Sequence, residues 1–250
     1  MPRGVNDVFH IKNNIAAGLA LAALLTIMAA CAHNVRSAPD MSAVAAPANI
    51  DLTDLKEVTD TPETIKLRIG TGNPVTGKSK SELCQGCHGE EGNSPDPMIP
   101  NLAGQYSGYI IKQIQNFQSG LRTHQIMSAI AASVNNNDLP DIAAYFASRT
   151  KMKGDGSEGD PAGKNLFLKG DMTRMMVSCV NCHGINGKGK APRNPVFPVI
   201  GGQHKEYIRG QLINFREGDR ANSPGGVMNI IAQKLTDTEI NALADYISRR

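Results

Sequence analysis

Two short segments of the chain place two thiols and an imidazole at one spacing. Residues 84–88 read C-Q-G-C-H and residues 179–183 read C-V-N-C-H. Two thiols at this spacing can form thioethers to the vinyl groups of one haem, and the adjacent histidine can then bind the iron from one side. The sequence therefore predicts two covalently bound haem c groups. Their expected attachment residues are Cys84, Cys87, Cys179 and Cys182, and their first axial iron ligands are His88 and His183.

Other uses of paired cysteines fit this chain less well. The pairs of a zinc ribbon usually lie about 15–20 residues apart, whereas Cys84 and Cys179 are 95 apart and each pair has its own histidine. A thioredoxin-like motif would lie beside a βαβ pattern, and no strand-rich run flanks either motif. Structural disulfides remain the alternative. The fifth cysteine, Cys31, is left without a haem.

Two methionines are candidates for the second axial position. A haem that carries electrons needs a ligand that does not exchange readily, and a methionine thioether also raises the reduction potential. Met127 and Met228 lie 101 residues apart at matched places before the closing helix of each half, so we expect both to bind iron. His124 is an alternative ligand for the first haem. Most other methionines have the character of loop or packing residues, among them Met172, Met175 and Met176.

The chain after residue 65 is an internal duplication. The two haem motifs are offset by 95 residues, and Tyr145 and Tyr246 near the closing segments are offset by 101. Between them, one set of residues recurs at an offset of 98: Pro100, Gly104, Gln105, Tyr109, Gln113, Asn116, Phe117, Gly120 and Arg122. A period near 100 residues indicates repeated domains and not a solenoid. We expect a first domain over 66–150, a polar Gly-rich linker over 151–158 and a second domain over 159–250.

Helices must position these residues. Apolar residues follow helical spacing over 109–117 and 207–215, and again in closing segments over 139–146 and 240–247. Thr236 or Asp237 is placed to cap the last helix, and no alternating strand pattern competes. The sequence predicts an all-α protein. Each copy is small for an independent core, so we expect the covalently held haem to supply apolar mass.

The N-terminal segment has the pattern of an export signal. Arg3 and Lys12 precede an apolar run over 15–30, which is shorter than the roughly 20 residues of a bilayer span. We expect a signal peptide over 1–30 and, from its polar, Pro- and Ala-rich composition, a flexible tether over 31–65. The segment 28–31, M-A-A-C, resembles a lipoprotein box, which predicts lipidation of Cys31 and a periplasmic, membrane-anchored protein. Simple cleavage after Ala32 is the alternative, and an uncleaved anchor is a third.

Charge gives no indication of a nucleic-acid partner. The chain has a formal net charge of +3, and removal of residues 1–30 lowers Lys plus Arg from 26 to 24 and Asp plus Glu from 23 to 22. The propionates of two haems would bring the remainder close to neutral. No dense cluster of Lys and Arg appears, so we expect no nucleic-acid binding.

These features together resemble the cytochrome c4 family of dihaem electron carriers. The resemblance covers about residues 77–250 and includes P-N-L-A-G-Q at 100–105, G-G-Q-H at 201–204, F-R-E-G at 215–218 and A-A-Y-F at 143–146. It implies two class I cytochrome c domains related by a pseudo-twofold axis, with His/Met ligation by His88 with Met127 and His183 with Met228. It also implies that the carbonyls of Pro100 and Pro198 accept a hydrogen bond from the ring N–H of the ligating histidine.

The resemblance implies an electron-transfer protein with redox partner proteins and no substrate turnover. By analogy, electrons would pass from a quinol-oxidising complex or a dehydrogenase to a terminal oxidase. A dihaem peroxidase is the main alternative, but it needs an iron that can open, and the paired methionines argue against that. A fixed haem subunit of an oxidoreductase complex is the other alternative.

Overall fold

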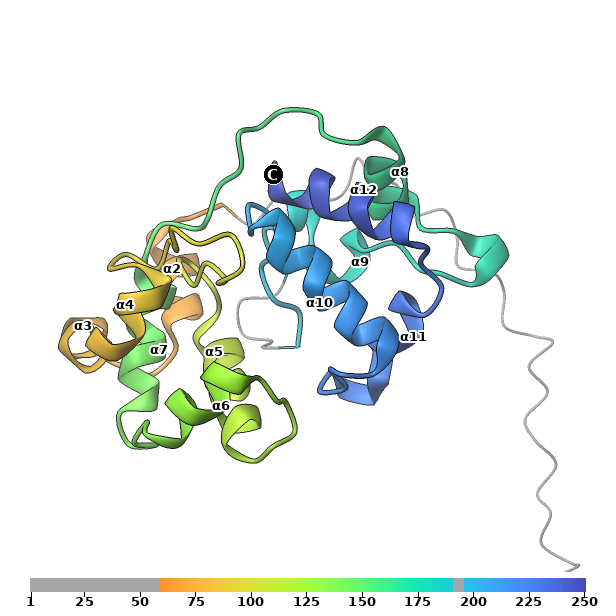
Figure 1. Ribbon diagram of the computed structural model, residues 1–250. Coiled ribbons are helices and arrows are strands. Elements are labelled where there is room, and N and C mark those ends of the chain that lie inside the picture. The colour runs from red at the N-terminus through yellow and green to blue at the C-terminus, as the bar shows by residue number, and fades with distance from the viewer. Residues whose placement is uncertain (1–58, 191–195) are drawn as a thin grey trace, which may run out of the picture. The chain divides into compact units, whose positions relative to one another are not determined.

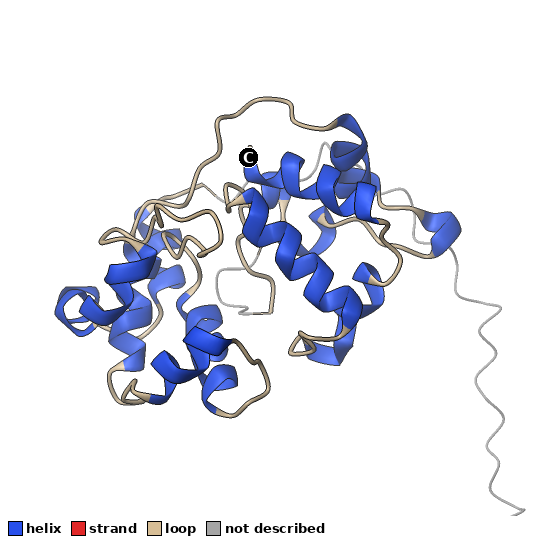
Figure 2. Ribbon diagram, viewed as in Figure 1, coloured by secondary structure: helices blue, strands red, loops and turns tan. Residues whose placement is uncertain are grey.

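The computed structural model describes residues 59–190 and 196–250. Within these residues the regular elements are helices, and the only β-type pairings are two isolated bridges, Arg122 with Arg220 and Asp171 with Met176 (Figures 1 and 2). The all-α prediction is therefore confirmed. The expected signal peptide, Cys31 and most of the expected tether lie outside the described residues. No helix in the described part is long and apolar enough to cross a membrane.

The first half is built around its closing helix. Helix α7 packs against α2, α3 and α5, and α5 also packs against α6. Ile110, Ile142, Tyr145 and Phe146 form the core between them, with Tyr145 and Phe146 fully buried. The helices of this half are α2 (Pro62–Ile69), α3 (Pro74–Lys80), α4 (Glu82–His88), α5 (Ser107–Gln118), α6 (Gln125–Ala132) and α7 (Leu139–Ser148).

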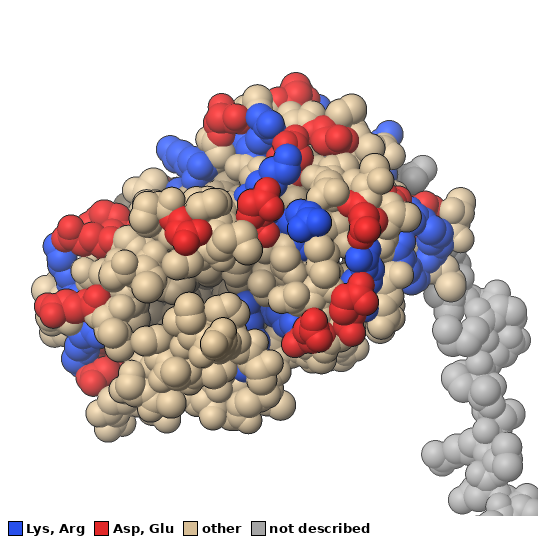
Figure 3. Space-filling view, viewed as in Figure 1, with Lys and Arg blue, Asp and Glu red and all other residues tan. Residues whose placement is uncertain are grey.

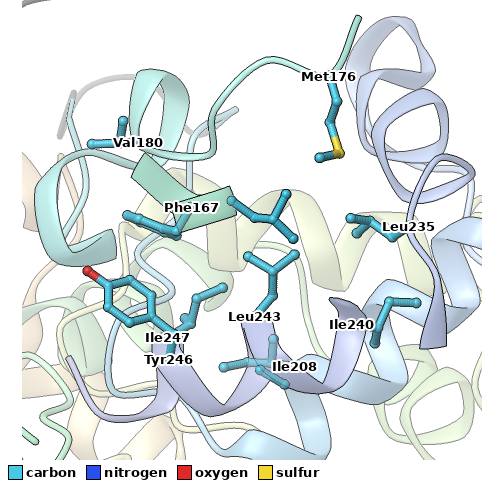
Figure 4. Packing of buried hydrophobic residues seen from close by; sticks show 11 residues of the cluster. Phe167, Met176, Val180, Ile208, Leu235, Ile240, Leu243, Tyr246 and Ile247 are labelled. Carbon is cyan, nitrogen blue, oxygen red and sulfur yellow. The ribbon is translucent and has the colours of Figure 1, made fainter. Parts of the chain in front are cut away.

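The second half repeats this arrangement. Helix α12 packs against α8 and α10, and α10 packs against α11; Figure 4 shows Phe167, Leu243 and Ile247 among the buried side chains of this core. Thr236 caps α12 in a reciprocal capping box with Glu239, as the sequence predicted. The elements are α8 (Pro161–Lys169), η4 (Met172–Arg174), α9 (Val180–His183), η5 (Ile185–Gly187), α10 (Lys205–Glu217), η6 (Pro224–Gly226), α11 (Val227–Ala232) and α12 (Asp237–Ser248).

Helix α2 begins inside the segment that composition had predicted to be a tether. Thr61 caps it and Pro62 occupies its first turn, where proline is well tolerated. The residue that fixes it is Arg68, which is 2% exposed and donates to the carbonyls of Ala147 (2.6 Å) and Arg149 (3.1 Å). Because a buried arginine holds this helix and not an apolar stripe, hydrophobic periodicity could not reveal it.

The two halves differ in the segment that precedes the haem motif. A Cβ on Gly77 would lie 2.0 Å from the carbonyl oxygen of Asp141, and a Cβ on Gly163 would lie 2.0 Å from that of Ala242, so these two glycines make the same close approach to the closing helix. Residues 78–83 separate Gly77 from Cys84, whereas residues 164–178 separate Gly163 from Cys179. The second half therefore carries nine additional residues here. They lengthen α8 and form most of the segment 170–178, which we call the 170–178 loop.

Candidate functional site

The first C-x-x-C-H motif forms helix α4. His88 is its last residue and is 5% exposed. Its Nδ1 lies 2.8 Å from the carbonyl oxygen of Pro100. A carbonyl can only accept, so Nδ1 carries the proton and Nε2 keeps a lone pair, which is the form of imidazole that binds a metal.

The second motif has the same geometry on helix α9. His183 ends this helix, is 8% exposed, and places Nδ1 2.9 Å from the carbonyl oxygen of Pro198. Burial lowers the pKa of both His88 and His183, although the proline carbonyls oppose the shift. Both rings are therefore neutral at physiological pH, with one nitrogen fixed and the other available.

No disulfide joins the four cysteines of the described residues. Burial raises the pKa of Cys84 and Cys182, and it raises the pKa of Cys179 to about 12. A redox-active C-x-x-C pair has a lowered thiol pKa instead. A raised pKa keeps Cys84, Cys179 and Cys182 protonated at neutral pH, so their environment does not suit disulfide exchange.

Met127 and Met228 occupy equivalent short helices. Met127 lies in the first turn of α6 and Met228 in the first turn of α11; both are half-buried. His124 is the N-cap residue of α6, and its Nδ1 accepts from the backbone N–H of Met127 at 3.3 Å. This capping bond uses one ring nitrogen of the alternative ligand His124. The expected Met–iron bonds stay a prediction.

Six side chains, three from each half, form a polar cluster between the halves. We call Arg122, Arg220, Tyr109, Tyr207, Gln113 and Gln211 the arginine cluster. Arg122 donates to Gln113 Oε1 (2.7 Å), Tyr207 Oη (3.0 Å) and Gln211 Oε1 (2.8 Å). Arg220 donates to Gln211 Oε1 (2.7 Å), Tyr109 Oη (3.0 Å) and Gln113 Oε1 (3.2 Å). The pattern is nearly symmetric, because the cluster consists of residues related by the offset of 98.

The arginine cluster contains two cations and no carboxylate. Among the described residues, no hydrogen-bond partner of Arg122 or Arg220 is an acid, and Arg220 is only 6% exposed. Burial acts to lower the pKa of Arg220, but Tyr109 and Tyr207 hold it above the usual value. Burial acts to raise the pKa of Tyr109, but the charges of Arg220 and Arg122 lower it. Within the part of the chain that the structure describes, Gln113 Nε2 is buried with no hydrogen-bond partner. The buried Arg220, the half-buried Arg122 and this unused donor make the cluster a place suited to carboxylates.

Two glutamines clamp the halves together by backbone hydrogen bonds. Gln203 accepts from the N–H of Asn101 (2.8 Å) and donates to its carbonyl (2.9 Å). Gln105 makes the equivalent pair with Val199, accepting at 3.0 Å and donating at 2.8 Å. Both glutamines are buried. Each clamp satisfies a backbone donor and acceptor that would otherwise be buried without partners.

Sequence reasoning recovered the haem motifs but not these contacts between the halves. Gln105, Gln113 and Arg122 appeared in it only as landmarks of the repeat, with no role assigned. Their recurrence at a fixed offset could have indicated these contacts, because a glutamine that only faces solvent would not be expected to recur in both halves.

Charged groups of both signs are mixed over much of the face shown in Figure 3. The area over α5 and α6 carries few charges, and residues 113–137 include only one charged side chain, Arg122. This face therefore has no patch of a single sign large enough to attract a polyelectrolyte.

Comparisons with known proteins agree with this geometry. The cytochrome c family model matches residues 162–249. A cytochrome c4 from Pseudomonas aeruginosa is 40% identical over 186 residues, covering 72% of this chain and 90% of that protein. A thiosulfate dehydrogenase electron acceptor from Stutzerimonas stutzeri is 33% identical, covering 72% and 82%. The crystal structure of reduced recombinant cytochrome c4 from Pseudomonas stutzeri matches with a TM-score of 0.66 and 37% identity, covering 71% of this chain and 98% of that one.

Proposed function

We propose, from the premise that the chain belongs to the cytochrome c4 family of dihaem electron-transfer proteins, that it carries single electrons within a respiratory chain. Membership confirms the resemblance seen in the sequence, the two covalent haem c groups and the electron-transfer rather than enzymatic character of the protein. The donor, the acceptor and the role of each residue are our proposal.

The observation that carries the residue assignment is the matched His–Pro pair. His88 on Pro100 and His183 on Pro198 present the same neutral imidazole, held at Nδ1 within 2.8–2.9 Å of a carbonyl. A bound haem c supplies an iron that changes its charge by one electron. The chain's residues then hold the ring orientation and keep water from the ligating nitrogen, because both histidines are buried.

We assign the remaining ligands by their places in the two halves. Cys84, Cys87, Cys179 and Cys182 would form the thioethers to haem c, and Met127 and Met228 would supply the second iron ligand of each haem. A methionine ligand would favour the reduced state and would leave the iron without an open position for a substrate.

The arginine cluster suits the haem propionates. Among the described residues, buried Arg220 and half-buried Arg122 have no acidic hydrogen-bond partner, and Gln113 Nε2 has no partner. Carboxylates from both haem groups would satisfy these donors and neutralise the buried charge. The same residues join the two halves, so propionate binding would also hold the halves in one arrangement.

We place the protein between a quinol-oxidising complex or a dehydrogenase and a terminal oxidase. The similarity to a thiosulfate dehydrogenase electron acceptor supports a dehydrogenase as donor. We also propose a periplasmic location, with a signal peptide over 1–30, a lipidated Cys31 and two cytochrome domains over 66–150 and 159–250 joined by residues 151–158. The first domain also includes α2, so the proposed tether that begins at residue 31 ends before Pro62 and not at residue 65.

A spectroelectrochemical titration of the full-length holoprotein tests the carrier function. We expect two positive-potential centres, each with the long-wavelength absorption band of an Fe(III)–methionine bond. A high-spin haem that turns over peroxide would contradict the proposal. For the anchor, Cys31→Ser should move the protein from the membrane to the soluble fraction and remove the lipid from its mass; unchanged retention would refute lipidation.

A further inference from the structure

The 170–178 loop exposes apolar side chains beside the second haem motif. Met172 is 53%, Met175 78% and Val177 41% exposed, whereas Met176 between them is buried in the core. Val177 lies two residues before Cys179, so its Cα is within about 7 Å of that of the attachment cysteine. The first half has only six residues between Gly77 and Cys84 and therefore no equivalent of this loop.

The loop is held in a defined shape. Asp171 and Met176 exchange backbone hydrogen bonds, both 2.8 Å, and so close the loop. Arg174 fixes its middle by donating to Asp171 (2.7 Å), Glu239 (2.6 Å) and the carbonyl of Lys234 (2.8 Å). Lys234 in turn donates to the carbonyls of Arg174 (2.7 Å) and Met175 (2.9 Å). An exposed loop with this much internal bonding is ordered before any partner arrives.

Met175 adopts a conformation that a methionine rarely adopts. Its φ of 50° and ψ of 41° lie in the left-handed region, which suits glycine and costs other residues energy. The side chain makes no compensating burial, since most of it faces solvent. Strained backbone is common at functional sites, so the strain at this exposed residue is consistent with a contact to another molecule.

We propose that the 170–178 loop is the surface on which a redox partner protein docks to exchange electrons with the second haem, and that the partner meets it with an uncharged apolar patch. This rests on the carrier function proposed above. Arg174 forms ion pairs with Asp171 and Glu239, and the ammonium of Lys234 donates to two loop carbonyls. These four groups carry two charges of each sign, so their charges cancel and the loop tip offers mainly apolar contact. Flexible methionines suit a surface that accepts more than one partner.

The size and composition of the loop favour a redox partner protein over a second copy of the chain or a membrane surface. Three exposed side chains cannot supply the roughly 800 Å² per subunit that a stable dimer buries, but they suit the smaller contact of a transient electron-transfer encounter. Membrane-surface segments rely on aromatic and basic residues, and the chain has no tryptophan and the loop no aromatic residue. A second copy and a lipid surface are therefore outcomes for the test.

The test compares three forms of the full-length holoprotein with the wild type. Met172→Gln with Met175→Gln removes the apolar tips. Met175→Gly removes one tip and relieves the left-handed strain, so its thermal midpoint should not fall. Val75→Gln is the matched control, because Val75 is 80% exposed on α3 in the first half. Respiratory membranes of the host, supplied with quinol, serve as donor, and the same membranes with oxygen serve as acceptor.

For both loop variants, we expect the cytochrome concentration that gives half the maximal rate of electron exchange with the membranes to rise in at least one direction. For the double variant this concentration should rise about tenfold. The shift should be the same at low and high salt, and reduction by ascorbate should not change. Exchange equal to that of Val75→Gln would overturn the loop proposal alone. Wild-type self-association that the loop variants lose, measured by sedimentation, or wild-type binding to protein-free anionic vesicles that they lose, would overturn it in favour of a second copy or a lipid surface. A wild type that exchanges with the membranes in neither direction would refute the proposed route, and the docking surface with it.

Discussion

The clamp formed by Gln203 should carry a large share of the stability that joins the two halves. Replacing Gln203 by methionine keeps the side-chain length but removes the amide, so the N–H and the carbonyl of Asn101 both lose their partner. Asn101 is 8% exposed, and water cannot readily replace these bonds. An orphaned buried donor or acceptor costs roughly 1–3 kcal/mol, so the two together should lower the free energy of unfolding by about 2–6 kcal/mol.

This loss should lower the thermal midpoint of the holoprotein by roughly 4–24 °C, since about 1 kcal/mol shifts a protein of this size by 2–4 °C. Differential scanning calorimetry measures it, with Gln115→Met as the matched control because Gln115 is exposed on α5. Combining Gln203→Met with Gln105→Met should split the transition in two as the halves uncouple. The reasoning fails if Gln203→Met costs no more than Gln115→Met, because its hydrogen bonds would then carry no net stability.

Three further predictions concern the cofactor sites and acid stability. Cys179→Ser should leave the second haem with one thioether, which mass spectrometry of proteolytic peptides would detect; two intact thioethers would refute the assignment. Met228→His should lower one midpoint potential and leave the other in place, because imidazole does not favour Fe(II) as a thioether does; an unchanged titration would exclude Met228 as ligand. Arg174 lowers the pKa of Glu239 to about 2, below its unfolded value of about 4.3. The contribution of the ionised Glu239 to stability is therefore complete above about pH 4.3 and is lost as the pH falls toward 2. In that window the urea midpoint of Glu239→Gln should depend less on pH than the midpoint of the wild type. Parallel curves for the two proteins would contradict this.

The sequence was most informative where chemistry and apolar periodicity coincide. The motifs at 84–88 and 179–183 predicted the cofactor, and the spacing over 109–117 and 240–247 predicted helices that the structure contains. Offsets between landmarks aligned the two copies, but the first landmark was the haem motif itself. The nine additional residues before Cys179 could therefore not be recognised from the sequence. The structure reveals them because Gly77 and Gly163 make equivalent contacts with the closing helices and so align the two halves upstream of the haem motifs.

Polar contacts are the other part that the sequence did not disclose. Arg68, Gln105 and Gln203 are among the most buried side chains of the described residues, yet their types are common on surfaces. Hydrophobic periodicity counts such residues as exposed, and nothing in a single sequence says which carbonyl a glutamine will meet. Recurrence within the duplication was the one physical clue, because equivalent residues of two halves can meet across a pseudo-twofold axis.

One pair of equivalent contacts shows that the halves are fitted to each other and are not interchangeable. His204 of the second half places Nε2 3.0 Å from the carbonyl oxygen of Ser94. The equivalent residue of the first half is Tyr106, which lies against Gly189, the equivalent of Ser94; a Cβ there would lie 1.9 Å from the tyrosine Oη. The larger Tyr106 is thus matched by a residue without a side chain opposite it. Burial raises the pKa of Tyr106 to about 12, and its Oη has no hydrogen-bond partner among the described residues. Because serine at 189 would collide with Tyr106, two copies of the first half could not pair in this way. The duplication therefore became a fixed pair with distinct members, which is the condition for two haem sites to face different partners.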